Sequence, residues 1–268
     1  MKKYILALFS IGLLTFAFSI LVKPSFGKST QRLFRLPVNA KAISPNLYHL
    51  GYAKDVNGRE VEGYAYIHRK ESEIKPEKPG KGRQSCYGYI ANGAKWREVE
   101  GWVVNPANTK GLNEGFIYSN LVSDIDKWNS AAGQTVVGSG TGTTDTLFAD
   151  TGSPDNKNEV YFADIEDSSA IGVTIVWGYF SGPPQTRELV EWDQVYDDSD
   201  YDWSLSGEAN KMDFENIATH EIGHTFGMGD VYSPDCAEVT EYGYADYGET
   251  NKRSLEQPDI DGVKALYK

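Results

Sequence analysis

The strongest periodic pattern of apolar and polar residues lies in "MDFENIATHEIGHTFGMG", residues 212–229. Four apolar side chains recur at intervals of four residues and form one stripe: Phe214, Ala218, Ile222 and Phe226. This spacing predicts an amphipathic helix that packs its stripe on the core. Asp213 can cap the first turn of this helix, and Gly227 is a stop signal after it.

Upstream of that helix, strand and helix patterns alternate. "REVEGWVVNP", residues 97–106, predicts a strand that ends at a proline turn, and "NEGFIYSNLVSDIDKWNSA", residues 113–131, predicts a helix. Strand-like runs follow at residues 159–165, 170–180 and 188–197. Because only "SGPPQTR" separates the last two runs, we expect them to form an antiparallel hairpin.

The N-terminal residues have the pattern of an export signal. Lys2 and Lys3 precede an uncharged apolar run at residues 4–22, and the small residues in "KPSFG" suit a cleavage point. We therefore predict a signal peptide over residues 1–27 and a secreted mature protein. A membrane anchor that faces the outside is the alternative, because the apolar run approaches the roughly 20 residues that span a bilayer.

Residues 28–85 form a candidate pro-segment. Their stretch "RKESEIKPEKPGKGR", residues 69–83, is charged, rich in proline and glycine, and nearly free of apolar side chains. Such a stretch cannot bury a face, so we expect an exposed linker of the kind that processing proteases cut. A plain N-terminal extension that is never removed is the alternative.

The chain has two cysteines, Cys86 and Cys236. In an exported protein, a pair of cysteines most simply forms one disulfide. Two unpaired buried thiols are a second interpretation. In a third, the Cys86 thiolate caps a metal ion in a latent precursor, because a thiolate is a good zinc ligand.

The net charge of −12, from 26 basic and 38 acidic residues, argues against a nucleic-acid partner because a phosphate backbone would be repelled. Acidic residues are densest in "DQVYDDSDYD", residues 193–202. Carboxylates in this run could hold calcium, but the run lacks a defined calcium-loop pattern. A solvated acidic loop is the favoured interpretation, and no calcium ligands are assigned.

The amphipathic helix with the Phe214–Phe226 stripe carries the candidate chemistry, in "HEIGHTFGMGD", residues 220–230. His220 and His224 are one turn apart, so their imidazoles lie on one helical face. A glycine turn can bring Asp230 back toward them. Two imidazoles and a carboxylate are three zinc ligands with a fourth position open, which is typical of catalytic zinc.

Glu221 is the candidate general base beside this metal site. Zinc lowers the pKa of its bound water, and Glu221 can take the proton from that water and pass it to a leaving amine. These roles together predict hydrolysis of peptide bonds. His49 and His68 lack any such spacing, and we interpret them as surface or core histidines.

"HEIGHTFGMGD" resembles the metzincin signature HExxHxxGxxH/D, with aspartate as the third ligand. The stretches "CYGYIANGAKW" and "YGYADYGETNKRSLEQPDIDGVKALY" are similar to those of the matrixin-like secreted metalloproteases of bacteria and archaea. The resemblance covers most of residues 86–268, which it identifies as a zinc metalloprotease catalytic domain. It implies an α+β fold with a twisted mixed sheet, an antiparallel edge strand, an active-site helix under the sheet and a C-terminal helix.

The resemblance also implies positions for the substrate and for the last helix. "AIGVTIVWGYF", residues 170–180, would be the edge strand that binds the backbone of a protein or peptide substrate by strand addition. "QPDIDGVKALYK", residues 257–268, would be the final helix, with Pro258 in its first turn.

One position departs from the family pattern. Glu241, in "CAEVTEYGY", stands where the family has the methionine of the turn beneath the zinc. Three outcomes are open: Glu241 turns outward, it perturbs the metal site, or it marks a weakened enzyme. The alternative function that this residue raises is a secreted zinc-containing binding module without turnover. We expect partial exposure, with Lys252 or Arg253 as a cationic partner. By resemblance, Tyr242 is a candidate to support the oxyanion.

Overall fold

The structure is a computed structural model that describes residues 32–71 and 85–268. The predicted signal peptide at residues 1–27 and most of the predicted linker at residues 69–83 lie outside the described residues. Within the described part of the chain, no helix has both the length and the apolar character that crossing a bilayer requires.

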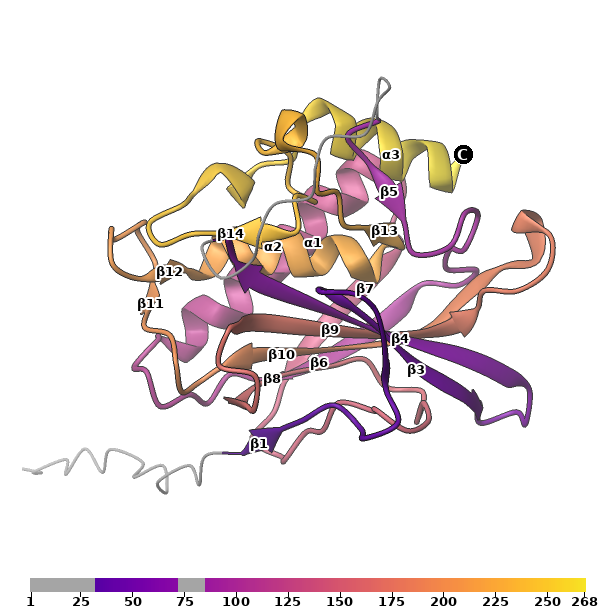
Figure 1. Cartoon of the computed structure of the whole chain (residues 1–268), viewed down its shortest axis with the longest axis horizontal. Coiled ribbons are helices and arrows are strands. Elements are labelled where there is room, and N and C mark those ends of the chain that lie inside the picture. The colour runs from indigo at the N-terminus through magenta and orange to yellow at the C-terminus, as the bar shows by residue number, and fades with distance from the viewer. Residues whose placement is uncertain (1–31, 72–84) are drawn as a thin grey trace, which may run out of the picture.

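The described residues form a mixed ten-stranded sheet with three α-helices on one side of it (Figure 1). The helices are α1 (Glu114–Ala132), α2 (Phe214–Thr225) and α3 (Gln257–Tyr267). The N-terminal strands of the sheet are β1 (Leu33–Phe34), β2 (Lys41–Ser44), β3 (Leu47–Lys54) and β4 (Glu60–Lys70). Its later strands are β6 (Glu100–Asn105), β7 (Val137–Gly142), β8 (Glu159–Ile165), β9 (Ala170–Tyr179), β10 (Glu188–Asp197) and β14 (Tyr244–Ala245).

Several short elements connect these strands and helices. Two small sheets pair β5 (Gly88–Tyr89) with β13 (Met228–Gly229) and β11 (Trp203–Ser204) with β12 (Met212–Asp213). The short 3-10 helices are η2 (Pro184–Thr186), η3 (Pro234–Cys236) and η4 (Asn251–Arg253). This mixture of a sheet and a few helices is the α+β class that the sequence predicts.

The periodic pattern and its capping residues place α2 correctly. Asp213 caps the helix as predicted, because its side chain accepts a hydrogen bond from the backbone N–H of Asn216. The helix ends at Thr225, earlier than the apolar pattern does. Gly227 then adopts a φ of 88°, a conformation that favours glycine, and this turn redirects the chain toward Asp230.

The main strands run in the order β2-β3-β4-β9-β10-β8-β6-β7. Strands β10, β8, β6 and β7 run parallel to one another. Strand β9 pairs antiparallel with β10, as the predicted hairpin. The last helix, α3, begins at Gln257 with Pro258 in its first turn, also as predicted. The sequence therefore predicts the elements of the C-terminal part well.

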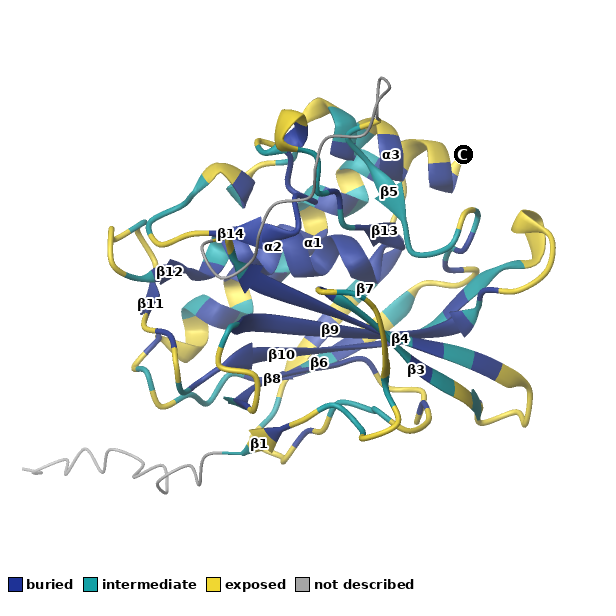
Figure 2. Cartoon of the chain, in the orientation of Figure 1, coloured by how far each residue is buried: buried dark blue, intermediate teal, exposed yellow. Residues whose placement is uncertain are grey.

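The predicted edge strand, β9, is not an edge of the whole sheet. Among the strands that follow residue 85, β9 is outermost, but β4 from the N-terminal segment pairs antiparallel along its free side. The alternating run "EGYAYIH" supplies the apolar side chains that bury β4 there. Figure 2 shows the end of β4 beside α2 as buried and its far end as exposed. The N-terminal segment thus covers the edge that we expect a substrate to use.

The predicted linker at residues 69–83 begins too early. Arg69 belongs to β4 and is only 5% exposed. Its guanidinium pairs with the carboxylate of Asp167 and donates to the carbonyl of Pro45. The composition of this stretch predicted that Arg69 is solvated. Composition does not show that the carboxylate of Asp167, in the turn before β9, pairs with it.

Two apolar cores lie on the two faces of the sheet. The first lies between the sheet and the helices and includes Trp128, Trp192, Phe214, Ile222 and Phe226. The second lies on the opposite face and includes Phe34, Leu50, Ile67, Ile175 and Trp177. Since the second core takes side chains from both the N-terminal segment and the later strands, the N-terminal segment is part of the folded unit.

The two cysteines form the predicted disulfide, Cys86–Cys236, across a sequence separation of 150 residues. The interpretations as free thiols and as a metal-capping thiolate are therefore wrong. Closing so long a loop stabilises the fold by about 4–5 kcal/mol in the chain-entropy model. The bond joins the start of the C-terminal part to the turn that follows Asp230.

Only the second half of the acidic run at residues 193–202 is a loop, and there Asp200 and Asp202 are exposed. Asp193 and Asp197 lie in β10, and both are buried. Asp193 accepts hydrogen bonds from the backbone N–H groups of Asp150 and Glu159. Asp197 likewise accepts from three backbone N–H groups in the turn that follows β10. These carboxylates therefore order the chain around the end of the strand.

Candidate metal centre

Helix α2 and the turn after it bring His220, His224 and Asp230 together. The Nε2 atoms of His220 and His224 lie 3.3 Å and 3.5 Å from the same oxygen, Oδ1 of Asp230. The three residues offer ligand atoms that all lie within 4.8 Å of one another. This is the group that the sequence pattern selected, and its members meet because the chain reverses at Gly227.

Backbone carbonyls orient both imidazoles. Nδ1 of His220 lies 2.8 Å from the carbonyl oxygen of Thr240, and Nδ1 of His224 lies 3.1 Å from that of Met228. Since a carbonyl only accepts, each Nδ1 carries the proton and each Nε2 keeps its lone pair for a metal. Burial lowers the pKa of His220 and of His224, which favours the neutral form that binds metals.

Asp230 is held as a carboxylate. Burial by itself would raise the pKa of Asp230, but His224 and His220 beside it bring that pKa down to about 2. The hydroxyl of Tyr232 donates a hydrogen bond of 2.6 Å to its second oxygen, Oδ2. Tyr232 is a supporting residue that the sequence reasoning missed, because an aromatic residue two positions after a ligand has no special spacing.

The donor set fits a metal ion such as zinc. In the described residues, Nε2 of His220 and Oδ1 of Asp230 are buried without a hydrogen-bond partner. A buried polar atom without a partner costs about 1–3 kcal/mol. A cation between these atoms removes that cost, and two imidazoles with a carboxylate are ligands that zinc accepts.

Glu221 projects from α2 toward β9. The hydroxyl of Thr174 on β9 donates to its Oε2, whereas Oε1 is buried without a hydrogen-bond partner among the described residues. Burial raises the pKa of Glu221 above its ordinary value. Gly172 leaves room for the carboxylate, since a Cβ there would lie 3.1 Å from Oε1. One oxygen is thus fixed and the other is available for proton transfer.

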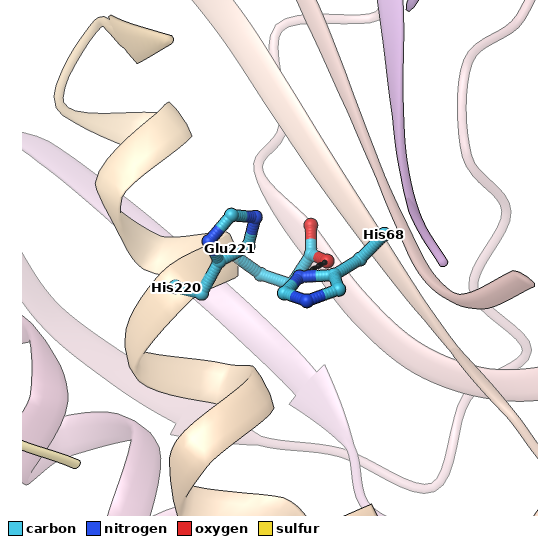
Figure 3. A group of neighbouring side chains, drawn as sticks. All are labelled: His68, His220 and Glu221. Atoms are coloured by element: carbon cyan, nitrogen blue, oxygen red, sulfur yellow. Dashed lines mark ion pairs between the residues drawn. The ribbon is translucent and has the colours of Figure 1, made fainter. Parts of the chain in front are cut away.

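His68 also reaches this site, which the sequence reasoning did not predict. It comes from β4, is 2% exposed, and lies with its ring centre 3.9 Å from that of His220. Figure 3 shows its imidazole beside the carboxylate of Glu221, and its Nδ1 is 3.5 Å from Oε1. Burial lowers the pKa of His68 to about 3, so the ring is neutral.

Tyr66 accompanies His68 on the same strand. Its ring stacks on that of His224, with the ring centres 4.3 Å apart. Residues two apart on a strand face the same side, so the pair Tyr66 and His68 is a signal available in the sequence. That signal shows a shared face, but it does not show what the face contacts.

Glu241 is buried, and the prediction of partial exposure is wrong. Its exposed fraction is 0%, and its Oε2 lies 3.6 Å from Nδ1 of His224. Neither carboxylate oxygen has a hydrogen-bond partner among the described residues. Burial raises the pKa of Glu241 well above its ordinary value. Gly223 on α2 makes room for it, because a Cβ there would overlap the carboxylate at 1.8 Å.

The two predicted cationic partners of Glu241 bind other carboxylates. Lys252 pairs with Glu249, which lies three residues before it. Arg253 pairs with Asp213, the residue that caps α2. Proximity in sequence therefore did not identify a partner for Glu241. The 3-10 helix η4 directs Lys252 toward Glu249 and Arg253 toward Asp213.

Tyr242 lies next to Glu241 with its ring in a small apolar cluster that includes Val231 and Val239. Its hydroxyl donates a hydrogen bond of 3.2 Å to Oε1 of Glu71, just after β4. In this arrangement its hydroxyl is engaged with the N-terminal segment. Its role in supporting an oxyanion stays a prediction from the resemblance.

Comparison with known proteins agrees with this geometry over part of the chain. Residues 185–268 match the family model described as Matrixin, Peptidase_M10. Metalloendoproteinase 1 of Glycine max is 37% identical over 76 residues, and Matrilysin of Homo sapiens is 36% identical over 70 residues. Each alignment covers 26% of this chain, and the chain spans about a quarter of each relative, 24% and 25% respectively. The family match includes α2, the three candidate ligands and α3.

Proposed function

We propose that the chain is a secreted, matrixin-like zinc-dependent endopeptidase that acts on protein or peptide substrates, and its similarity to matrixins in the C-terminal part supports this. The observation that carries the proposal is the convergence of His220, His224 and Asp230 beside the carboxylate of Glu221. A zinc ion with three protein ligands keeps one position for chemistry. Secretion rests on the export pattern in residues 1–27.

Glu221 is the residue that would move the proton. A bound zinc ion would supply a Lewis acid that lowers the pKa of water toward neutrality and polarises a peptide carbonyl. Thr174 holds Oε2 of Glu221, so Oε1 is the atom that takes a proton from water and passes it to the leaving amine. The raised pKa of Glu221 makes its carboxylate a stronger base.

A substrate backbone would bind along β9. Gly172 on this strand lies against Glu221, so a peptide added to β9 would bring its carbonyls close to the metal ligands. In the intact chain β4 takes that place. Substrate binding therefore requires β4 to leave, and a cut in the predicted linker would release its covalent connection.

The test is the variant Glu221→Gln after limited proteolysis within residues 72–84. Removing the base should lower the cleavage rate of a denatured protein substrate by about 100-fold or more, while zinc content stays near one per chain. Glu215→Gln on the same helix is the matched control, because Glu215 pairs with Lys127 away from the metal ligands. Equal cleavage by the Glu221→Gln and Glu215→Gln variants would contradict the mechanism.

A secreted zinc-containing binding module without turnover is the second candidate, and the buried Glu241 favours it. A carboxylate 3.6 Å from Nδ1 of His224 can disturb the orientation of that ligand. This candidate predicts zinc binding but no hydrolysis of any protein or peptide, even after removal of residues 28–85. Broad cleavage of casein by the processed form would eliminate it.

A further inference from the structure

The position of β4 is that of a bound peptide. It pairs antiparallel with β9 from Glu62 to Arg69, and its last residues pair in parallel with β14 on the other side. The strand therefore lies between the two segments that flank the candidate metal centre. Its buried half passes directly over α2, where it presents Tyr66 and His68 to the histidines of that helix.

We propose that β4 supplies His68 as a fourth protein ligand to the metal ion held by His220, His224 and Asp230, so that the intact chain closes its own metal centre. The inference adds a ligand to the site of the proposed function, and its consequence for latency rests on that function. The ligand assignment itself concerns metal coordination, which is measured without any substrate.

The geometry around His68 supports this assignment. His68, His220 and Glu221 offer ligand atoms that lie within 4.8 Å of one another, and His220 also belongs to the group with His224 and Asp230. His68 belongs to the first group only, so its imidazole has to shift toward His224 and Asp230 to share one ion with them. Three imidazoles and one carboxylate complete the four-coordinate shell that is typical of closed zinc sites. With all four positions taken by protein, the centre has no position for a reactive water.

Packing alone does not account for His68. Both of its ring nitrogens are buried without a hydrogen-bond partner among the described residues. A core histidine normally satisfies at least one nitrogen, because each unpaired polar atom costs free energy. A metal ligand satisfies this need through one nitrogen, and the carboxylate of Glu221 is 3.5 Å from Nδ1.

Neighbouring contacts hold the imidazole in place. Arg69, the next residue, pairs with Asp167 and donates to the hydroxyl of Ser169 in the turn before β9. Tyr66, two residues earlier, stacks on His224. These contacts anchor β4 on both sides of His68 and keep its ring next to that of His220.

The experiment compares the full chain with its His68→Gln variant after both are loaded with zinc. X-ray absorption at the zinc edge should count three imidazoles in the unaltered chain and two in the variant. The zinc affinity of the variant, measured by competition with a chelator, should fall by about tenfold or more, as expected when a ligand is lost. His49→Gln is the matched control, because His49 pairs with Glu62 on the neighbouring strand and should change neither value.

The measurement on the unaltered chain decides the assignment even if the His68→Gln variant folds poorly. Two imidazoles in the unaltered chain would overturn the proposal, and so would an unchanged affinity in a folded His68→Gln protein. Hydrolysis separates this inference from the proposed function. If zinc coordination differs between the two proteins but no form hydrolyses a substrate, the ligand assignment holds and the proposed function fails. If the protein hydrolyses a substrate but coordination is the same in both proteins, the proposed function holds and the ligand assignment fails.

Discussion

At the scale of single residues, the candidate metal centre depends on the hydrogen bonds that orient each candidate ligand. Carbonyl oxygens of Thr240 and Met228 orient the two imidazoles, and Tyr232 holds Asp230. Glu241 lies in the same layer but finds no partner among the described residues. Replacing Glu241 should therefore raise the free energy of unfolding.

Glu241→Met should raise the free energy of unfolding by about 1–3 kcal/mol, since it removes a buried polar group without a partner. Urea denaturation of the metal-free protein measures this change. Glu238→Met is the matched control, because Glu238 is exposed in the same turn and should change stability little. A Glu241→Met protein that unfolds more easily would show a stabilising role for the carboxylate.

The gain from Glu241→Met should also depend on pH. Burial raises the pKa of Glu241 in the fold, so between its ordinary value of 4.5 and the higher folded value the unfolded chain has lost a proton that the folded chain keeps. Stability of the unaltered protein therefore falls as pH rises through this window. Urea titrations at about pH 4 and pH 8 should show the larger difference between the two proteins at pH 8.

At the scale of elements, the pairing of β4 with β9 decides whether the site is covered. Their ladder runs alongside the second apolar core, to which β4 contributes Ile67 and β9 contributes Ile175. Near the metal centre, the ladder is anchored by the pair of Arg69 with Asp167. Weakening this pair should loosen that end of β4 without substituting any candidate metal ligand.

Asp167→Asn should therefore speed amide hydrogen exchange in the last residues of β4. The carboxylate of Asp167 is 43% exposed, so losing its charge should cost about 1 kcal/mol, which corresponds to roughly fivefold faster local exchange. Exchange followed by mass spectrometry on peptides that contain Ile67 tests this. The neighbouring variant Glu166→Gln should leave the exchange unchanged, and equal protection in the two variants would contradict the anchoring role.

At the scale of the whole molecule, the N-terminal segment and the C-terminal part form two sides of one apolar core. Phe34, Leu50 and Ile67 come from the N-terminal side, while Ile175 and Trp177 come from the C-terminal side. The disulfide between Cys86 and Cys236 closes the C-terminal part on itself. A cut between the two sides would thus break one covalent connection and leave the packing intact.

Processing in the predicted linker should remove roughly 5–7 kDa from the secreted chain, a mass that follows from the linker's position. Because the shared core still holds β4 after the cut, the N-terminal fragment should dissociate slowly in native buffer and at once in denaturant. Intact-mass measurement in native and denaturing solvents tests both points. A full post-leader chain in an active preparation would remove the pro-segment interpretation. A fragment that leaves as fast in native buffer as in denaturant would contradict the shared core.

The sequence by itself determined the features that depend on local spacing. His220, Glu221, His224 and Asp230 lie on one helix and the turn after it, so helical geometry and a glycine turn bring them together. The same holds for α1, β6, β8, β9 and β10, whose apolar patterns predict them, whereas β7 has no such pattern and α3 was expected from the resemblance. Only two cysteines were present, so the disulfide had a single possible pairing within the chain.

The tertiary structure decided which distant segments meet. His68 joins His220 because β4 pairs with β9, and Glu241 lies apart from both predicted cationic partners because η4 directs Lys252 and Arg253 elsewhere. Periodicity shows which face of a strand is apolar, but it does not show which edge that strand will cover. Strand pairing and ion-pair partners are set by the burial of the whole molecule, which is why they appeared only in the folded chain.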